Sequence, residues 1–547
     1  MYLTSNLFAK KIIPLVFALI SFSLSCTNIL VSRGASSNRS VMITYSCDGE
    51  FYPHLRITPA ADHDPGDSLE FRNRDGKIIA KIPQPPHTYK VVGLMNEFQL
   101  VIGETTFSGR EELRNPDGLL HYWTLMNLAL QRAKTAREAI AVITGLVQKY
   151  GYASTGETFS IADPNEVWIM EMIGPGPGGS GAEWVARRIP DGYISCHANK
   201  ARISTFPLDD PDNCLYSDNV ISFAIGKGYY DPKSGVPFRF NEAYCPDTPR
   251  NRRYADARVW SIFRRAAPSR NFSPAYQRGD EKAEPYPLWI KPDHKLSTAD
   301  VIALMRDHYE GTPFDMTKGI DAGPFGSPNR WRPISWKADS VEYVWERPIS
   351  TQQTAYSIVS QSRADMPNAV GGVLWYGLDD TYTTCYMPFY CGINEIPEEL
   401  GKGSLKSFNW DSPWWIFNLV ANYANLKYSY MIKDIRKVQQ KLEGDFFTLQ
   451  PAVEATAVSL ADKNPRALQT FLTDYSLSHA NLVFRRWKEL ARFLITKYND
   501  GYVQDTPGRP SEKGYPQSWL KKVVRERPEQ FKLEEKKDAT PESKLVD

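Results

Sequence analysis

The order of strand-like and helix-like segments constrains the fold of this chain more than any other feature of its sequence. Two strand patterns, TNILVS at 27–32 and RSVMITYS at 39–46, flank a turn-forming SRGASSN segment and predict a hairpin. Two helices are predicted over 119–150, because Thr135 and Glu138 form a capping-box pattern at the start of the second one. Strands followed by a helix pair indicate a layered fold.

Further strands are predicted on both sides of the helix pair. Before the helices, the segment VVGLMNEFQLVIGE predicts two short strands around a turn at Met95–Asn96. Four strands are predicted between 156 and 199, and a second cluster between 351 and 392. Residues 406–500 have helical periodicity, whereas 501–547 are polar and predict a disordered tail. The order predicts an α+β fold with a C-terminal helical region.

The first 25 residues have the pattern of a signal peptide. Two lysines precede about fourteen uncharged residues, which is too short for a membrane-spanning helix. Small residues, Ser23 and Ser25, stand where signal peptidase requires them before Cys26. We therefore expect export to the periplasm or the extracellular space, with no membrane span.

Charge and cysteine content narrow the function further. The net charge of +2 gives no reason to expect nucleic acid as a partner. The chain has 7 cysteines, an odd number, so at least one thiol is left over from pairing within the chain. Cys385 and Cys391 are compatible either with a disulfide bond between them or with two free thiols. No metal-binding or organic-cofactor motif is present in the sequence, so no cofactor is predicted.

Cys26 is the candidate nucleophile. If cleavage occurs after Ser25, its α-amino group is freed beside its thiol, and an amine with a pKa near 8 can serve as general base without a histidine. A long-range Cys/His pair is the weaker alternative, because no local signature supports it. A lipid-anchored Cys26 is the stronger rival and would attach the protein to a membrane surface. Ser23, where lipoproteins usually have a large aliphatic residue, and the apolar strand that follows Cys26 count against the anchor.

Several longer segments are spread along the chain, and they include CTNILVSRGAS at 26–36, PHTYKVVGLMNEFQLVIGETTFSGR at 86–110, GETFSIADPNEVWIMEMIG at 156–174 and WVARRIPDGYISCHANKARI at 184–203. Together these segments resemble peptidase family C69, the dipeptidases of the N-terminal-nucleophile (Ntn) hydrolase superfamily. The resemblance implies a four-layer αββα sandwich over 26–405. It also implies a relationship to choloylglycine hydrolases and penicillin V acylases.

The resemblance also implies roles for individual residues. Cys26 would be the nucleophile and Asp48 would hold its amine, while Asn96 would supply an oxyanion donor. Asn199 would be a second polar anchor and Arg258 a supporting arginine. The family's related group has an arginine three residues before the aspartate, where this chain has Tyr45. The cation that would stabilise the thiolate is therefore unassigned.

The function expected from sequence is that of an exported cysteine-type dipeptidase. An N-acyl amide hydrolase and a non-enzymatic lipoprotein remain alternatives, and homo-oligomerisation stays open. A dipeptidase must recognise a free α-ammonium group. Charge alone makes Glu97 and Glu171 candidates for that contact.

Overall fold

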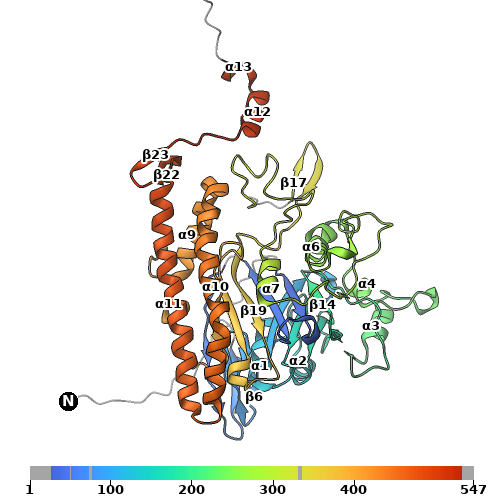
Figure 1. Cartoon of the computed structure of the whole chain (residues 1–547). Coiled ribbons are helices and arrows are strands. Elements are labelled where there is room, and N and C mark those ends of the chain that lie inside the picture. The colour runs from blue at the N-terminus through green and yellow to red at the C-terminus, as the bar shows by residue number, and fades with distance from the viewer. Residues whose placement is uncertain (1–25, 50, 73–76, 330–334, 533–547) are drawn as a thin grey trace, which may run out of the picture.

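The computed structural model describes residues 26–49, 51–72, 77–329 and 335–532. The predicted signal peptide and the last part of the predicted tail, 533–547, lie outside the described residues. The described chain forms two large antiparallel sheets, of seven and eight strands, and a C-terminal helical region (Figure 1). The α+β prediction is confirmed.

The seven-stranded sheet holds the segment that follows Cys26. Strand β1 (Asn28–Val31) lies between β14 (Ile194–His197) and β2 (Met42–Asp48), and the predicted hairpin is confirmed. All four residues of β1 are buried. The remaining strands of this sheet are β16 (Trp289–Ile290), β19 (Thr354–Gln361), β20 (Val373–Leu378) and β21 (Met387–Tyr390).

The eight-stranded sheet packs against the first one. A Cβ atom at Gly103 would lie 2.9 Å from the Asn28 amide nitrogen and 3.1 Å from Tyr45 Cβ, so glycine permits the close approach of the two sheets there. The strands, in spatial order, are β15 (Cys214–Tyr216), β13 (Glu183–Arg188), β12 (Val167–Ile173), β11 (Gly156–Ala162), β10 (Val101–Phe107), β9 (Met95–Asn96), β8 (Val91–Val92) and β3 (Ile57–Thr58).

Helices α1 (Tyr122–Arg132) and α2 (Ala136–Tyr150) pack on the eight-stranded sheet, and both were predicted. The Thr135 hydroxyl accepts a hydrogen bond from Glu138 N at 3.2 Å, which is the expected N-terminal cap. Helix α7 (Thr298–Met305) begins with a capping box and packs on β19 of the other sheet.

The predicted turn at Met95–Asn96 is wrong. These two residues form strand β9, which pairs with β8 on one side and with β10 on the other. The chain reverses on either side of them, where Gly93 and Gln99 adopt φ angles of 59° and 67°. Left-handed backbone, rather than the asparagine, marks these turns.

The C-terminal helical region is built from α9 (Pro413–Ala424), α10 (Tyr428–Ala461) and α11 (Pro465–Lys497). Figure 1 shows the long helices α10 and α11 side by side along the sheets. Two ion pairs, the buried Arg363–Glu454 at 2.7 Å and the partly buried Arg306–Glu443 at 2.6 Å, join α10 to the rest of the fold. Within the described ranges, no helix has an apolar stretch long enough to cross a membrane.

The prediction of a disordered tail from residue 501 onward is wrong for its first part. That part forms a hairpin and two short helices: β22 (Val503–Thr506), β23 (Arg509–Ser511), α12 (Gln517–Glu526) and α13 (Pro528–Phe531). Val503 is buried, and the Gln504 side chain donates to Thr496 O of α11 at 2.9 Å. The strongly charged composition that predicted disorder is concentrated after residue 531.

Candidate active site

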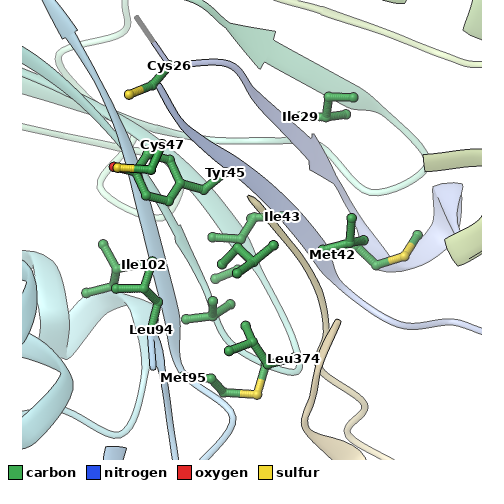
Figure 2. Close-up of a cluster of buried hydrophobic side chains, with 14 of the residues drawn as sticks. Cys26, Ile29, Met42, Ile43, Tyr45, Cys47, Leu94, Met95, Ile102 and Leu374 are labelled. Atoms are coloured by element: carbon green, nitrogen blue, oxygen red, sulfur yellow. The ribbon is translucent and has the colours of Figure 1, made fainter. Parts of the chain in front are cut away.

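Cys26 lies at one end of a buried hydrophobic cluster. Figure 2 shows Cys26, Cys47 and Tyr45 together at that end, with Met95 and Leu374 at the other. The Cys26 side chain is fully buried, and its Sγ lies 3.7 Å from Glu104 Oε1. The mainly apolar surroundings leave few polar groups beside the thiol, so each of them affects its chemistry.

Arg258, on helix α6 (Ala257–Ala266), joins Cys26 to segments far away in the sequence. Its Nη1 donates to Cys26 O at 2.7 Å and to Thr27 Oγ1 at 2.9 Å. Its Nη2 donates to Ala198 O at 3.1 Å and to Asn199 Oδ1 at 2.8 Å. The structure therefore brings together three of the five predicted site residues.

Asn199 follows strand β14 at a tight turn. Its φ of 60° is in the left-handed region, which asparagine tolerates better than most residues. Its Nδ2 donates to Thr106 O at 2.7 Å, while its Oδ1 accepts from Arg258. Asn199 thus links strand β10 to the arginine that holds Cys26.

Asp48 ends strand β2 and is buried. It forms an ion pair with Arg347 and accepts a hydrogen bond from Thr354 Oγ1 at 2.6 Å. Ser46 Oγ donates to the same carboxylate at 3.2 Å and accepts from Thr27 N at 3.0 Å. Asp48 is close enough for its charge to raise the pKa of the Cys26 thiol. A carboxylate has about four acceptor positions, so these contacts leave room for an amine.

Sequence analysis does not predict a role for Arg347. In the structure, Arg347 is a candidate for the thiolate-stabilising cation that is absent at the Tyr45 position. Arg347 and Arg258 are both fully buried, and the charge of Arg347 is within electrostatic reach of Cys26. Burial, followed by the charge of Arg347, lowers the pKa of Arg258 to about 10. Two arginines from distant segments therefore place positive charge near the thiol, and no local pattern around residue 347 signals this.

Asn96 is not brought to Cys26. Its Nδ2 donates to Leu130 O at 2.8 Å and Ala133 O at 2.7 Å, and its Oδ1 accepts from Phe98 N and Leu100 N. Both amide hydrogens are used at the end of α1, so no donor is left for an oxyanion in this arrangement. The predicted oxyanion role of Asn96 gains no support from the structure.

Charge alone made Glu97 and Glu171 candidates, but among the described residues no contact places either of them beside the Cys26 thiol. Glu171 accepts from the backbone N–H groups of Arg202 and Ile203, and Glu97 accepts from Lys90 N. The carboxyl next to Cys26 belongs to Glu104 instead. Its signal in the sequence is an acid in the middle of VIGETTF, an otherwise strand-like segment, because burying a charge there is costly unless it is used.

The Tyr45 hydroxyl lies 2.7 Å from both Cys47 Sγ and Glu104 Oε1. Its single proton can be donated to one of them at a time, and a carboxylate is the stronger acceptor. Tyr45 thus ties Cys47 and Glu104 into one polar network beside Cys26.

The pKa of the Cys26 thiol is raised well above its ordinary value. The main cause is burial, followed by the contact with Cys47 and the charge of Glu104. In the chain that still carries residues 1–25, the Cys26 nitrogen is part of a peptide bond and has no charge to offset these effects. The thiol is therefore held protonated in the unprocessed chain.

The other cysteines and His197 do not form a second catalytic arrangement. All seven cysteines are buried and unpaired, which answers the question left open for Cys385 and Cys391. His197 is hydrogen-bonded through both ring nitrogens, to Thr105 and Ser160, and burial lowers its pKa well below the ordinary value. Across the described residues, no group of three or more His, Cys, Asp or Glu side chains is arranged to hold a metal ion.

Comparison with known proteins identifies the family. The sequence model of peptidase family C69 matches residues 59–441, a range that includes Asn199 and Arg258 but not Cys26. A probable dipeptidase from Salmonella dublin is 27% identical over 420 residues, which cover 72% of this chain and 88% of that protein. A probable dipeptidase from Latilactobacillus sakei is 26% identical over 71% of this chain and 79% of its own length. Probable dipeptidase A from Streptococcus pyogenes is 24% identical over 85% of this chain and 99% of its own length. Because the match spans most of its length, this chain belongs to peptidase family C69.

Proposed function

We propose that this protein is an exported cysteine-type dipeptidase that is activated by cleavage between Ser25 and Cys26. The names of its relatives support peptide hydrolysis. The observation that carries the proposal is that Arg258, which is bound by Asn199, donates to Cys26, the residue that cleavage would place first in the chain. The two facing sheets, with helices packed on each, support the four-layer αββα arrangement.

In the proposed reaction the Cys26 thiol and its own α-amine act on the peptide, and water is the second reactant. The freed α-amine takes the proton of the Cys26 thiol as sulfur attacks the peptide carbonyl carbon. The C–N bond then breaks, and the α-ammonium passes its proton to the leaving amine. A water molecule attacks the resulting thioester, the α-amine accepts its proton, and the first amino acid leaves as the thiol reforms.

Charge near the thiol supports this mechanism. Cleavage would add an α-ammonium group to a site where burial and Glu104 now hold the thiol neutral. Asp48 is the nearby carboxylate that can hold this group, and Arg258 and Arg347 add positive charge. A positive charge next to a thiol lowers its pKa and raises the thiolate fraction.

The lipid-anchor alternative fits the structure poorly. The Cys26 side chain is fully buried, and the Cys26 carbonyl oxygen accepts from Arg258. A diacylglyceryl group on this sulfur would have to leave the core through packed side chains. The N-acyl amide alternative keeps the same nucleophile and differs only in what the acyl pocket recognises.

The test uses three proteins: the chain beginning at Cys26, the same chain with Cys26→Ala, and the unprocessed chain. We expect only the first to hydrolyse a dipeptide panel, with a loss of about 10⁴-fold or more for Cys26→Ala. N-terminal sequencing and intact mass of the exported protein should give a free Cys26 amine. Full activity of Cys26→Ala would reject the mechanism, and a diacylglyceryl adduct would reject the proposal as a whole.

A further inference from the structure

Two buried carboxyl groups lie side by side next to the Cys26 thiol. Glu104 is on β10 and Glu157 on β11, where Thr106 pairs with Glu157, so the two side chains are diagonal neighbours on one face. Both side chains have no exposed surface. Glu104 Oε1 lies 3.7 Å from Cys26 Sγ and accepts from Tyr45 OH at 2.7 Å. Thr106 Oγ1 donates to Glu157 Oε2 at 3.1 Å.

The other oxygen of each carboxyl group, Glu104 Oε2 and Glu157 Oε1, is buried and accepts from no N–H group or hydroxyl of the described residues. The two carboxyl groups are within hydrogen-bond reach of each other. The two groups interact with each other, and burial together with the charge of Glu104 raises the pKa of Glu157 well above its ordinary value. Burial raises the pKa of Glu104 as well, but its hydrogen bonds, including the one from Tyr45, oppose that rise, so Glu157 is the more strongly favoured of the two to be neutral.

Glu104 and Glu157 form no ion pair within the described part of the chain, whereas Asp48 nearby is paired with Arg347. An uncompensated buried charge is costly, and such charges are retained where a ligand or substrate supplies the opposite one. An ammonium group of a substrate placed beside the thiol would supply such a partner for Glu104.

We propose that Glu104, backed by Glu157, binds the α-ammonium group of the substrate's first residue and so selects peptides with a free N-terminus. The inference rests on the proposed function and names the subsite that makes the enzyme a dipeptidase instead of an N-acyl amide hydrolase. It gives Glu104 the role that charge alone suggested for Glu97 and Glu171.

Substrate geometry agrees with this placement. In a peptide the α-nitrogen lies about 2.5 Å from the carbonyl carbon of the same residue, because one carbon separates them. The attacking sulfur approaches that carbonyl carbon to about 3–3.5 Å. A carboxylate 3.7 Å from the sulfur is therefore within ion-pair reach of the ammonium group of the residue under attack. An acyl group without this charge would leave Glu104 buried and unpaired.

The test compares a dipeptide with its N-blocked form, Ala-Ala against N-acetyl-Ala-Ala, on protein beginning at Cys26. For Glu104→Gln we expect a loss of about 100-fold in kcat/KM for Ala-Ala, mainly through KM, and an unchanged or higher value for the acetylated peptide. Glu157→Gln should lose less than about tenfold, because glutamine resembles the protonated acid. Glu97→Gln is the matched control, in a turn away from the thiol, and should leave the ratio of the two substrates unchanged.

If Glu104→Gln lowered kcat/KM equally for both substrates, the inference would be overturned. Glu104 would then act on the thiol or on the Cys26 amine and not on the substrate's ammonium group. Unchanged activity on Ala-Ala would overturn it as well. Hydrolysis of neither peptide by the parent enzyme would instead overturn the proposed function, and this inference with it.

A binding measurement covers the case in which Glu104→Gln folds poorly. In the inactive Cys26→Ala background, calorimetry with Ala-Ala should give an affinity about 100-fold weaker when Glu104→Asp is added, because the shorter side chain withdraws the carboxylate. The same affinity in both proteins would contradict the inference.

Discussion

Two asparagines that the family resemblance placed in one catalytic site lie in two different regions of the molecule. Asn199 contacts Arg258, which in turn holds Cys26. Asn96 uses its whole side-chain amide on the backbone between β9, β10 and α1. Asparagines in two family motifs therefore have different partners, since one binds the arginine that contacts Cys26 and the other binds the backbone of a loop.

The same substitution at the two positions tests this difference. Asn96→Asp keeps the acceptor for Phe98 N and Leu100 N but removes the donors to Leu130 O and Ala133 O, and it buries a charge. We expect a loss of about 4 kcal/mol in the free energy of unfolding. The kcat of the molecules that remain folded should stay within about threefold. Urea unfolding with active-site titration measures both, and a stable but inactive Asn96→Asp would return Asn96 to the catalytic site.

Asn199→Asp should have the opposite effect. Aspartate tolerates the left-handed backbone and keeps the contact with Arg258, but it cannot donate to Thr106 O. We expect kcat to fall about 100-fold in protein beginning at Cys26, because the contact network around the nucleophile is disturbed. Unfolding free energy should change by less than about 1 kcal/mol. A large loss of stability with normal kcat would make Asn199 structural, like Asn96.

The loop that follows Asn199 should respond to pH. Burial raises the pKa of Glu171, which binds Arg202 N and Ile203 N, to about 7. The folded carboxyl group binds its proton more tightly than the unfolded one, so stability present at low pH is lost as pH rises through about 7. Between pH 5 and 8 the parent should lose about 2 kcal/mol relative to Glu171→Gln, which cannot titrate. Burial also raises the pKa of Asp379 to about 7, but this residue is present in both proteins, so its contribution cancels in the difference between their stabilities. Parallel stability curves would contradict the assignment.

The smallest effect is expected in the loop that Asn96 supports. Thr135→Ala removes the cap of α2, just after Ala133, whose carbonyl oxygen accepts from Asn96. We expect a loss of about 1 kcal/mol in unfolding free energy and unchanged kcat. Thermal unfolding followed by circular dichroism, with the exposed Thr456→Ala as a control, is sufficient. A change in kcat would connect this region to the active site after all.

Local sequence patterns were sufficient where local physics decides the structure. The hairpin after Cys26, the capped helix α2 and the buried strands of both sheets follow from periodicity and capping, because these depend on residues within one turn or one strand. The turn beside Asn96 was misplaced, because Gly93 and Gln99 carry the left-handed backbone on either side of it. The hairpin at 503–511 was missed, because its stability comes from packing on α11.

Local sequence patterns are enough to predict the α+β class and to place Cys26 just before a buried strand. They do not predict which distant residues come together around it. Arg258 contacts Cys26 and Asn199 contacts Arg258, Arg347 pairs with Asp48, and Glu104 lies beside the thiol. Asn96 instead binds the backbone at the end of α1. These contacts join segments up to about 300 residues apart in the chain, and the cost of burying each charge is met only by partners that folding brings in.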